Sequence, residues 1–507
     1  MIDARQGHGG SKGVGLRLIV MLLLVFGISS FAVAAEGSKR MLKNNMTEVY
    51  HVLPEPAATF AEAFTKGVVY GRLRANYFKW YWADSSYDPE GFGLGGSLIY
   101  KTAPFYGVSA TAGLYTSQNL GLLDDDDASG GKSGKDTFSR YDVLQNGRWG
   151  MTVLAQAYLQ VHVLKSDFKI GRQIFESFLT KSNDTKMIPN TFEGYALVSK
   201  DLPKTQIKAA YFTGQKLRDH TEFHDVITYT DGRGETYSKW NNNDDSAVHK
   251  GLSHANLVAA GKDTDNDLVI VGVTNKSIRN LKLDAWYTGV PDLVYSLMGE
   301  ANYKIALGGG WSITPGFRYM QQFDDGAGAV GGAALTGSLA RTSGSAKGYK
   351  DAANVDGKLY AGRVVGKKGA GSLLAGYSEV SDDADLIAPW RGFPTGGYTR
   401  SMAQYNWEAE TKSWMVKVFY DFGKAGFLDG FRAALDYAYM NYDDTKEQLA
   451  GHSKTDRGII HADLWYKFPC LPALEAKVRI GLVNANATRT GSDPSYDEFR
   501  VEFNYLF

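Results

Sequence analysis

The stretch DEFRVEFNYLF, residues 497–507, alternates charged or polar residues with apolar and aromatic ones up to the last residue of the chain. The apolar residues share one parity: Phe499, Val501, Phe503, Tyr505 and Phe507. The charged or polar residues hold the other: Glu498, Arg500, Glu502 and Asn504. A period of two residues is that of a β-strand, in which successive side chains point to opposite faces. The stretch therefore predicts a strand with one apolar and one charged face.

The same alternation recurs along the chain in eighteen stretches. They lie at about 67–81, 91–102, 106–118, 149–163, 167–176, 192–199, 204–214, 266–273, 279–288, 292–305, 309–323, 357–366, 370–379, 411–423, 430–442, 458–468, 474–485 and 497–507. Short turns alternate with long loops rich in Gly, Asp, Asn and Ser, which is typical of an up-and-down barrel in an outer membrane. Such a barrel has no free edge, and it exposes the apolar parity to lipid and the charged parity to a water-filled lumen. The sequence predicts an all-β fold: a transmembrane antiparallel barrel of about 18 strands over residues 67–507.

The composition fits an exported barrel. The 507 residues include 58 Gly, 30 Tyr and 25 Phe, which is rich in turn-forming and aromatic residues. The formal net charge is 0, so charge gives no reason to expect a nucleic-acid partner. The single cysteine, Cys470, cannot form an internal disulfide or a multi-thiolate metal site.

The N-terminus has the pattern of a secretory signal peptide. Two basic residues precede an apolar run over residues 18–33, and small residues follow, so cleavage is expected after Ala34 or Ala35. The alternative is a retained anchor helix, but the small residues at the end of the run fit cleavage better. Residues 1–35 are therefore predicted to be removed.

Residues 36–66 are predicted to form an N-terminal leader before the first strand. Within it AATFAEAFTKG, residues 57–67, can form a short helix with Phe60, Ala61 and Phe64 on one side. The helix could pack against or inside the periplasmic mouth, or the leader could be loose.

The most distinctive stretch is FKIGRQIFESFLTKSNDTKMIPNTFEGYALVSK, residues 168–200, and it resembles the third-loop region of the OprD family of outer-membrane porins. The residues that carry the resemblance are Gly171, Arg172, Gln173, Ser182, Asn183, Asp184, Met187, Pro189 and 191–194. GFGLGG, FTGQKLRDHTEF, YMQQFDDGAG, SWMVKVFYDFGKAG and the terminal DEFRVEF fit the family in the same order. The resemblance covers nearly the whole mature chain.

This resemblance implies a monomeric barrel whose third loop, here about residues 173–191, folds inward and makes the constriction. It implies a row of basic residues on the lumen wall, opposite acidic and polar groups of inward loops. It also implies passive diffusion of small water-soluble solutes, often carboxylates. The strand that ends at Phe507 resembles the signal by which barrels reach their assembly machinery.

Candidate lumen residues come from strand parity and from the resemblance. Parity places these basic residues on the lumen face: Lys282, Lys304, Arg318, Lys417, Lys477, Arg479 and Arg500. It offers as acidic partners Glu300, Asp436 and Asp463. The resemblance adds to the constriction Arg172, Ser182, Asn183, Asp184 and Glu193. A narrow, low-dielectric lumen strengthens the attraction of such cations for anions, and the arginine fork binds both oxygens of a carboxylate.

Two residues complicate this assignment. Arg172 shares the parity of the lipid-facing Phe168 and Ile170, so it needs a bulge near Gly171 to point inward. Asp436 stands in a strand where family members tend to carry an arginine, which leaves open whether anions or basic amino acids are preferred. A single wall charge can equally be a solvated lumen residue without a selective role.

Three further motifs have simpler interpretations. GFGLGG has the spacing of a dinucleotide fingerprint, but strand rather than helix follows it. The acidic run 124–127 lacks the spacing of a calcium loop, and the pair His220 and His224, with His249 and His254 later in the same loop, lacks an HExxH motif. Metal binding at either place stays open. No arrangement of a nucleophile with a base stands out, so the sequence gives no support to catalysis and indicates no cofactor.

The sequence thus predicts an outer-membrane porin for passive, partly selective diffusion of small solutes, with carboxylates and amino acids as candidate permeants. The alternatives are an unselective general porin, a plugged structural or adhesive barrel, and an outer-membrane enzyme. The expected partners are outer-membrane lipid, the barrel assembly machinery through the Phe507 strand, and small permeants.

Overall fold

The structure is a computed structural model that describes residues 40–42, 48–50, 54–84, 88–120, 137–139, 147–182, 187–228, 249–402, 404–446 and 454–507. The predicted signal peptide, the acidic run 124–127 and the pair Asn183 and Asp184 lie outside the described residues. In those ranges no helix has the length and apolar character needed to cross a membrane.

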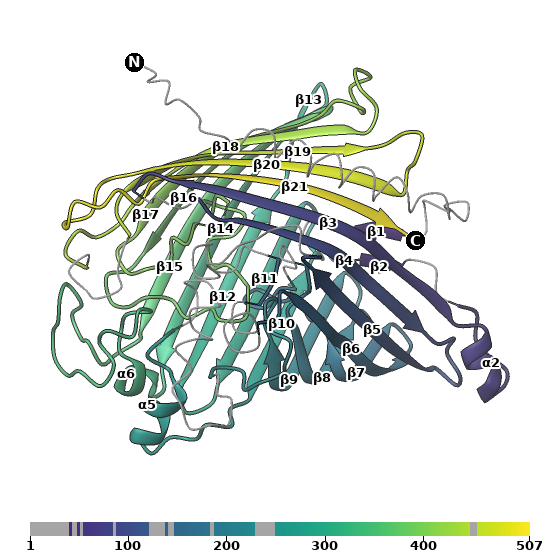
Figure 1. Ribbon diagram of the computed structural model, residues 1–507, viewed down its shortest axis with the longest axis horizontal. Coiled ribbons are helices and arrows are strands. Elements are labelled where there is room, and N and C mark those ends of the chain that lie inside the picture. Colours follow the sequence, from purple (N-terminus) through teal and green to yellow (C-terminus); the bar gives the residue numbers. More distant parts are fainter. Residues whose placement is uncertain are drawn as a thin grey trace.

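Antiparallel strands close into one barrel (Figure 1). The first half contains β3 (Val68–Trp82), β4 (Glu90–Lys101), β5 (Val108–Gln118), β6 (Gly150–Val163), β7 (Ser166–Gln173), β8 (Thr191–Ser199), β9 (Thr205–Lys216), β10 (Leu268–Asn275), β11 (Leu281–Val290) and β12 (Val294–Tyr303). The second half contains β13 (Ile305–Gly308), β14 (Trp311–Asp324), β15 (Gly357–Lys368), β16 (Gly371–Val380), β17 (Lys412–Asp421), β18 (Phe431–Asn441), β19 (Arg457–Lys467), β20 (Leu474–Ala485) and β21 (Tyr496–Leu506). Because β13 continues β12 alongside β14, the described chain forms a closed barrel of 18 strands, as the sequence predicts.

The barrel closes where the two ends of this strand series meet. β21 pairs with β3 over its whole length. Beyond the ladder, the Gly71 amide donates to the Phe507 carbonyl and the Phe507 amide donates to the Gly71 carbonyl, both at 3.1 Å. Closure therefore includes the last residue of the chain.

Alternation gives the wall two different faces. Val416, Tyr437, Ile460 and Leu482 follow one another in register across β17, β18, β19 and β20, and all four are exposed on the outside. The neighbouring row on the inside contains Lys417, Asp436 and His461 instead. The outer row is suited to lipid and the inner row to water.

The two ends of the barrel differ. The helices α5 (His254–Ala259) and α6 (Ala327–Gly331) belong to long loops at one end, while α2 (Phe60–Thr65) lies near the other end, where the turns are short (Figure 1). The leader also contains β1 (Arg40–Leu42) and β2 (Glu48–Tyr50), which pair in a separate two-stranded sheet. The predicted leader helix is thus present as α2.

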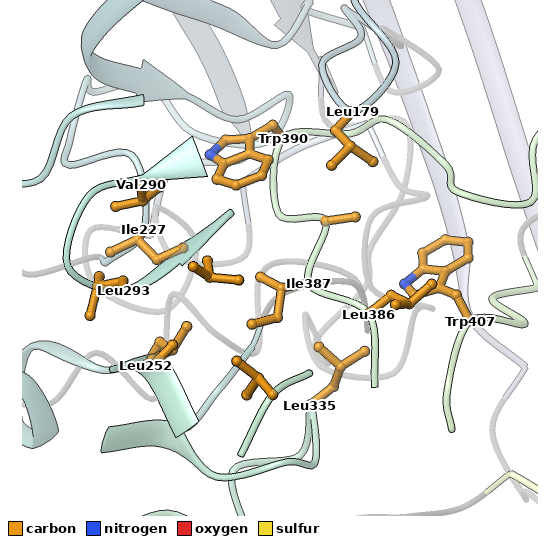
Figure 2. Packing of buried hydrophobic residues seen from close by; sticks show 14 of the residues in the cluster. Leu179, Ile227, Leu252, Val290, Leu293, Leu335, Leu386, Ile387, Trp390 and Trp407 are labelled. Carbon is orange, nitrogen blue, oxygen red and sulfur yellow. The ribbon is translucent and has the colours of Figure 1, made fainter. Parts of the chain in front are cut away.

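The main hydrophobic core lies among the long loops rather than between sheets. Figure 2 shows side chains from four loops that pack together: Leu179, Ile227, Leu252, Leu335, Ile387, Trp390 and Trp407. Inward side chains of the strands join this loop core, among them Phe212, Leu268, Met320 and Leu359. At the long-loop end these inward side chains of the strands are therefore apolar, because packed loops rather than water cover the wall there.

Backbone contacts lock these loops to one another. The Gly392 amide donates to the Leu179 carbonyl at 2.8 Å, and the Lys181 amide donates to the Trp390 carbonyl at 3.1 Å. The Trp390 indole N–H donates to the Val226 carbonyl at 2.9 Å. A Cβ at Gly392 would lie 2.2 Å from backbone atoms of Leu179, so only glycine permits this approach.

Candidate functional site

The segment between β16 and β17, residues 381–411, is here called the strap. Near its middle, at Pro394–Tyr398, it meets three charged residues of the wall: Glu300 of β12, Arg318 of β14 and Arg363 of β15. Arg318 donates from Nε and Nη2 to Glu300 Oε2 at 2.8 and 2.5 Å, and Arg363 Nη2 lies 3.3 Å from Glu300 Oε1. One carboxylate is thus held between two guanidinium groups.

The same two arginines hold the strap. Arg318 Nη1 donates to the carbonyls of Pro394 and Gly396 at 2.7 and 3.0 Å. Arg363 Nη1 donates to the Gly397 carbonyl at 2.7 Å. The ring of Tyr398 lies 4.6 and 4.5 Å from the two guanidinium carbons, within the range of cation–π attraction.

The third loop reaches this place too. The ring of Phe178 lies 5.1 Å from the Arg318 guanidinium, although Phe178 follows β7, several strands away around the barrel. The predicted inward loop at 173–191 and the strap therefore meet at the same point of the wall.

Further along, the strap contacts the wall beyond β17. Ser401 donates its hydroxyl to the Asp436 carboxylate on β18. Arg457 on β19 donates to the Gln404 side chain at 3.0 Å, and Gln404 donates to the Tyr496 hydroxyl on β21. The strap therefore runs from β14 and β15 to β18–β21, across the inside of the barrel at the long-loop end.

A second group of charges surrounds Asp436, the carboxylate that Ser401 of the strap contacts. Lys417 Nζ lies 3.0 Å from Asp436 Oδ2, and His461 Nδ1 lies 3.1 Å from the same oxygen. Next to them Arg479 donates to both oxygens of Asp463 at 2.8 and 3.2 Å, with Lys477 Nζ at 3.7 Å. Asp463 is again a carboxylate between two basic side chains.

A third group closes the row at the seam of the barrel. Glu502 of β21 lies 2.8 Å from Arg74 Nη2 on β3 and 3.1 Å from Arg500 Nη1. The Arg500 guanidinium also lies 4.2 Å from the ring of Phe78. All three charged side chains are buried.

Three clusters in the described part of the wall thus share one composition, two bases around one acid. They are Arg318, Arg363 and Glu300; Lys477, Arg479 and Asp463; and Arg74, Arg500 and Glu502. Within each cluster the two bases outnumber the acid, although Glu498 also acts on Arg500 and Arg479. The third cluster is buried, whereas the side chains of Arg363 and Arg479 are 21% and 16% exposed, so the first two clusters can offer a guanidinium to a second carboxylate.

The other predicted site residues lie apart from these clusters. Lys282 Nζ pairs with Asp284 on its own strand at 2.5 Å, and the side chain of Lys304 is exposed at the junction of β12 and β13. Ser182 is buried and its hydroxyl lies 3.4 Å from Glu176. Asn183 and Asp184 lie outside the described residues.

The Arg172 region has an irregular backbone. Arg172 and Glu193 face each other in register, with Nε and Oε2 3.3 Å apart, and the guanidinium lies 4.4 Å from the ring of Phe223. Gly171 has a φ of +116°, and the register of β8 with β9 shifts next to Glu193. The inward position of Arg172 at a constriction stays a prediction.

Sequence reasoning missed Arg74 and Arg363. Arg74 lies in the run YGRLRANYFKW, where its inward parity continues as Phe78 and Trp80, so the charged face does not stand out. The inward neighbours of Arg363 are Leu359 and Ala361, both buried by the loops. The signal that could have found them is register: Arg74 lies on the strand next to Glu502, and Arg363 lies two strands from Glu300.

Two groups of possible metal ligands lie among the described residues: the predicted pair His220 and His224, and a cluster of three carboxylates that the sequence did not indicate. His220 Nδ1 and His224 Nε2 lie 2.8 Å apart and share a hydrogen bond. Among the described residues, the carboxylates of Asp382, Glu410 and Asp443 approach one another closely enough to hold an ion. Lys446 Nζ already pairs with two of them, at 2.6 Å from Asp382 and 2.5 Å from Asp443.

We expect acid to loosen the loop core, because it contains buried neutral histidine. His249 is buried, its Nε2 donates to the Gly332 carbonyl at 2.8 Å, and burial lowers its pKa to about 4 from an ordinary 6.5. Between these values the unpacked loop binds the proton and the packed loop does not, so packing loses stability as pH falls from about 6.5 to 4, by roughly 3 kcal/mol in all. Current noise of reconstituted protein should rise over this range.

The matched variants are His249→Gln and His254→Gln, in the same loop. The first should show a smaller acid response, and the second should behave as wild type. An acid response of equal size in His249→Gln would contradict the assignment.

Replacing Glu502 by glutamine should destabilise the barrel seam. The change keeps the shape but removes the buried carboxylate from between Arg74 and Arg500, a loss that typically costs roughly 3–5 kcal/mol. The measurement is the urea midpoint of tryptophan fluorescence in lipid vesicles. Glu475→Gln is the control, because Glu475 pairs with a half-exposed Arg432 at 2.9 Å and should lose roughly 0–1 kcal/mol. Equal midpoints for both variants would show that the buried cluster does not stabilise the seam.

A closed barrel with a lipid-suited outside, a charged inner wall and inward loops defines a channel of the outer-membrane type. The family comparison agrees: a model described as outer membrane porin, OprD family, matches residues 122–507, and the chain belongs to this family. The protein is therefore a porin of the bacterial outer membrane. A search of curated proteins gave no match.

Solved porins share the fold. A structure of OpdK with vanillate from Pseudomonas aeruginosa is 16% identical, with a TM-score of 0.63 over 88% of this chain and 99% of that one. OccK8 (OprE) from the same organism is 16% identical, with a TM-score of 0.64 over 88% and 99%. OccAB1 from Acinetobacter baumannii is 14% identical, with a TM-score of 0.64 over 88% and 97%.

Proposed function

We propose that this porin passes small water-soluble solutes by passive, selective diffusion and favours solutes that carry a carboxylate. The observation that carries the proposal is the row of three wall clusters, each with two bases around one acid. A solute carboxylate can join the wall carboxylate at the first two clusters, where Arg363 and Arg479 are partly exposed. Several weak sites in series allow a solute to leave as well as to bind.

The loops support selectivity over general permeability. The strap and the third loop meet at Arg318, and a continuous hydrophobic core holds the long loops together. A passage next to packed loops is narrower than the barrel and brings the solute close to the charged wall. Similarity to OpdK, which was crystallised with vanillate, itself a carboxylate, supports the same class of solute.

The loop core also favours one rival, a plugged barrel that passes nothing. An unselective porin is the other rival. In both cases the protein would keep the fold and the family, so only transport measurements separate them. We also propose that the barrel works as a monomer and reaches the membrane through recognition of its C-terminal strand by the assembly machinery.

The test is single-channel recording of purified protein in a planar bilayer under a salt gradient, followed by addition of benzoate, succinate and arginine. We expect small, anion-preferring current steps that the carboxylates reduce at concentrations where an uncharged sugar of similar size does not. Large steps without any carboxylate effect would support the general porin. Silence from a sample whose electrophoretic mobility shows the folded barrel would support the plugged one.

A further inference from the structure

The short helix α2 is attached to the barrel at the turn between β4 and β5. The Ala103 amide donates to the Ala63 carbonyl at 2.8 Å, and the Ala57 amide donates to the Pro104 carbonyl at 2.8 Å. Ala57, Ala63 and Ala103 pack together and are buried. The helix is therefore a fixed part of the short-turn end, which is the periplasmic end in a barrel of this kind.

Tyr100 shows on which side of the wall the helix lies. Tyr100 shares its parity with Leu98 and pairs in register with Val69, and both of these residues are exposed on the outer face of the barrel. The Tyr100 hydroxyl donates to the Phe64 carbonyl at 2.7 Å. The helix thus lies on the lipid side of the wall and not inside the mouth of the barrel.

The helix presents its aromatic side chains away from the protein. Phe60 and Phe64 are 68% and 48% exposed, while Ala63 is buried against the turn. Phe105 lies 6.4 Å from Phe60, and Tyr106, which is 89% exposed, lies 4.5 Å from Phe105. Three exposed aromatic rings, joined by the partly buried Phe105, thus form a continuous patch, which a soluble protein would rarely leave in water.

Other short turns expose apolar side chains as well. Large, exposed apolar residues stand at turns around the barrel: Leu164, Leu202, Ile278, Leu307 and Phe427. The aromatic patch is therefore continuous with an apolar outer wall and belongs to an end of the barrel whose turns are themselves apolar. Glu62 and Lys66, which pair at 2.7 Å, supply a charged group on the same helix.

We propose that Phe60, Phe64, Phe105 and Tyr106 form an interfacial anchor that inserts into the periplasmic leaflet of the outer membrane. The ligand is phospholipid, at the boundary between headgroups and acyl chains, where aromatic rings are favoured. The patch fits this ligand because it adjoins the lipid-facing wall through Tyr100. The anchor fixes the depth of the barrel on this side and is independent of what the channel passes.

The test measures depth in the bilayer. The only cysteine, Cys470, is exposed and is first replaced by serine. Single cysteines are then placed by Phe60→Cys, Tyr106→Cys and, as the control on the charged side, Lys66→Cys, and labelled with the fluorophore NBD. Each aromatic position is tested with the other aromatic residues intact, and folding is checked by heat-dependent electrophoretic mobility.

In vesicles of phosphatidylcholine containing nitroxide-labelled lipid, we expect strong quenching and blue-shifted emission at positions 60 and 106. Position 66 should emit as in water and be quenched by iodide. If positions 60 and 106 are as accessible to iodide as position 66, the patch does not insert. That outcome overturns the anchor and leaves a protein partner as the occupant of the patch.

Discussion

Replacing Arg318 by alanine should raise the single-channel conductance several-fold and make the open current noisier. Arg318 is the residue in which the wall, the strap and the third loop meet: it binds Glu300, two strap carbonyls, Tyr398 and Phe178. Without it the strap loses two charge-assisted hydrogen bonds, each typically worth about 1.5–3 kcal/mol. The loops should then sample positions away from the wall, which widens the passage.

The control is Arg432→Ala, which also removes one guanidinium from the wall. Arg432 pairs with Glu475 at 2.9 Å. The conductance of this variant should stay near that of wild type. A retained wild-type conductance in Arg318→Ala, with the barrel folded, would mean that the strap does not limit the passage. Equal increases in the two variants would mean that charge rather than anchoring sets the conductance.

The double replacement Lys477→Gln/Arg479→Gln should lower the anion-to-cation permeability ratio about tenfold, which corresponds to ~1.4 kcal/mol. Both side chains face Asp463, at 3.7 and 2.8 Å, and the change removes both positive charges from beside this carboxylate, which keeps only the contact with His461 Nε2 at 3.4 Å. In a confined, partly dehydrated passage such a loss of charge acts on every ion that passes. The reversal potential under a salt gradient measures it.

The matched control is Lys367→Gln/Lys368→Gln, which removes two charges from exposed positions at the short-turn end of β15. Its reversal potential should differ little from that of wild type. If both double variants shift the potential alike, selectivity comes from the overall charge of the protein. If neither shifts it, the wall clusters are structural and the proposed preference for carboxylates loses its basis.

The strands could be predicted because one local rule governs most of them. The stretch 474–485 was expected as a strand and is β20 (Leu474–Ala485), and 497–507 is β21 with a shift of one residue. Lipid outside and water inside impose opposite demands on neighbouring residues, so the period of two is strong wherever both media touch the wall. Register then follows from the alternation and the short turns.

The loops could not be predicted in this way. Arg318 contacts the strap at Pro394 and Gly396, far along the chain, through backbone carbonyls that any sequence offers. The loop core also removes the signal from the strands that it covers, as at Met320 and Leu359, where the inward parity is apolar. Parity identified Arg318, Lys417 and Arg479, but not the partners that the loops bring to them.

The pairing of Gly71 with Phe507 means that the barrel closes only when its first and last strands are both present. Its first and last strands come from opposite ends of the chain, so no shorter N-terminal portion of the chain can close the ring. A polypeptide that stops early, or a damaged one that lacks the last strand, keeps two open sheet edges whose backbone groups invite aggregation or proteolysis. An open seam therefore distinguishes an unclosed copy from a finished one without reference to the passage or its solutes.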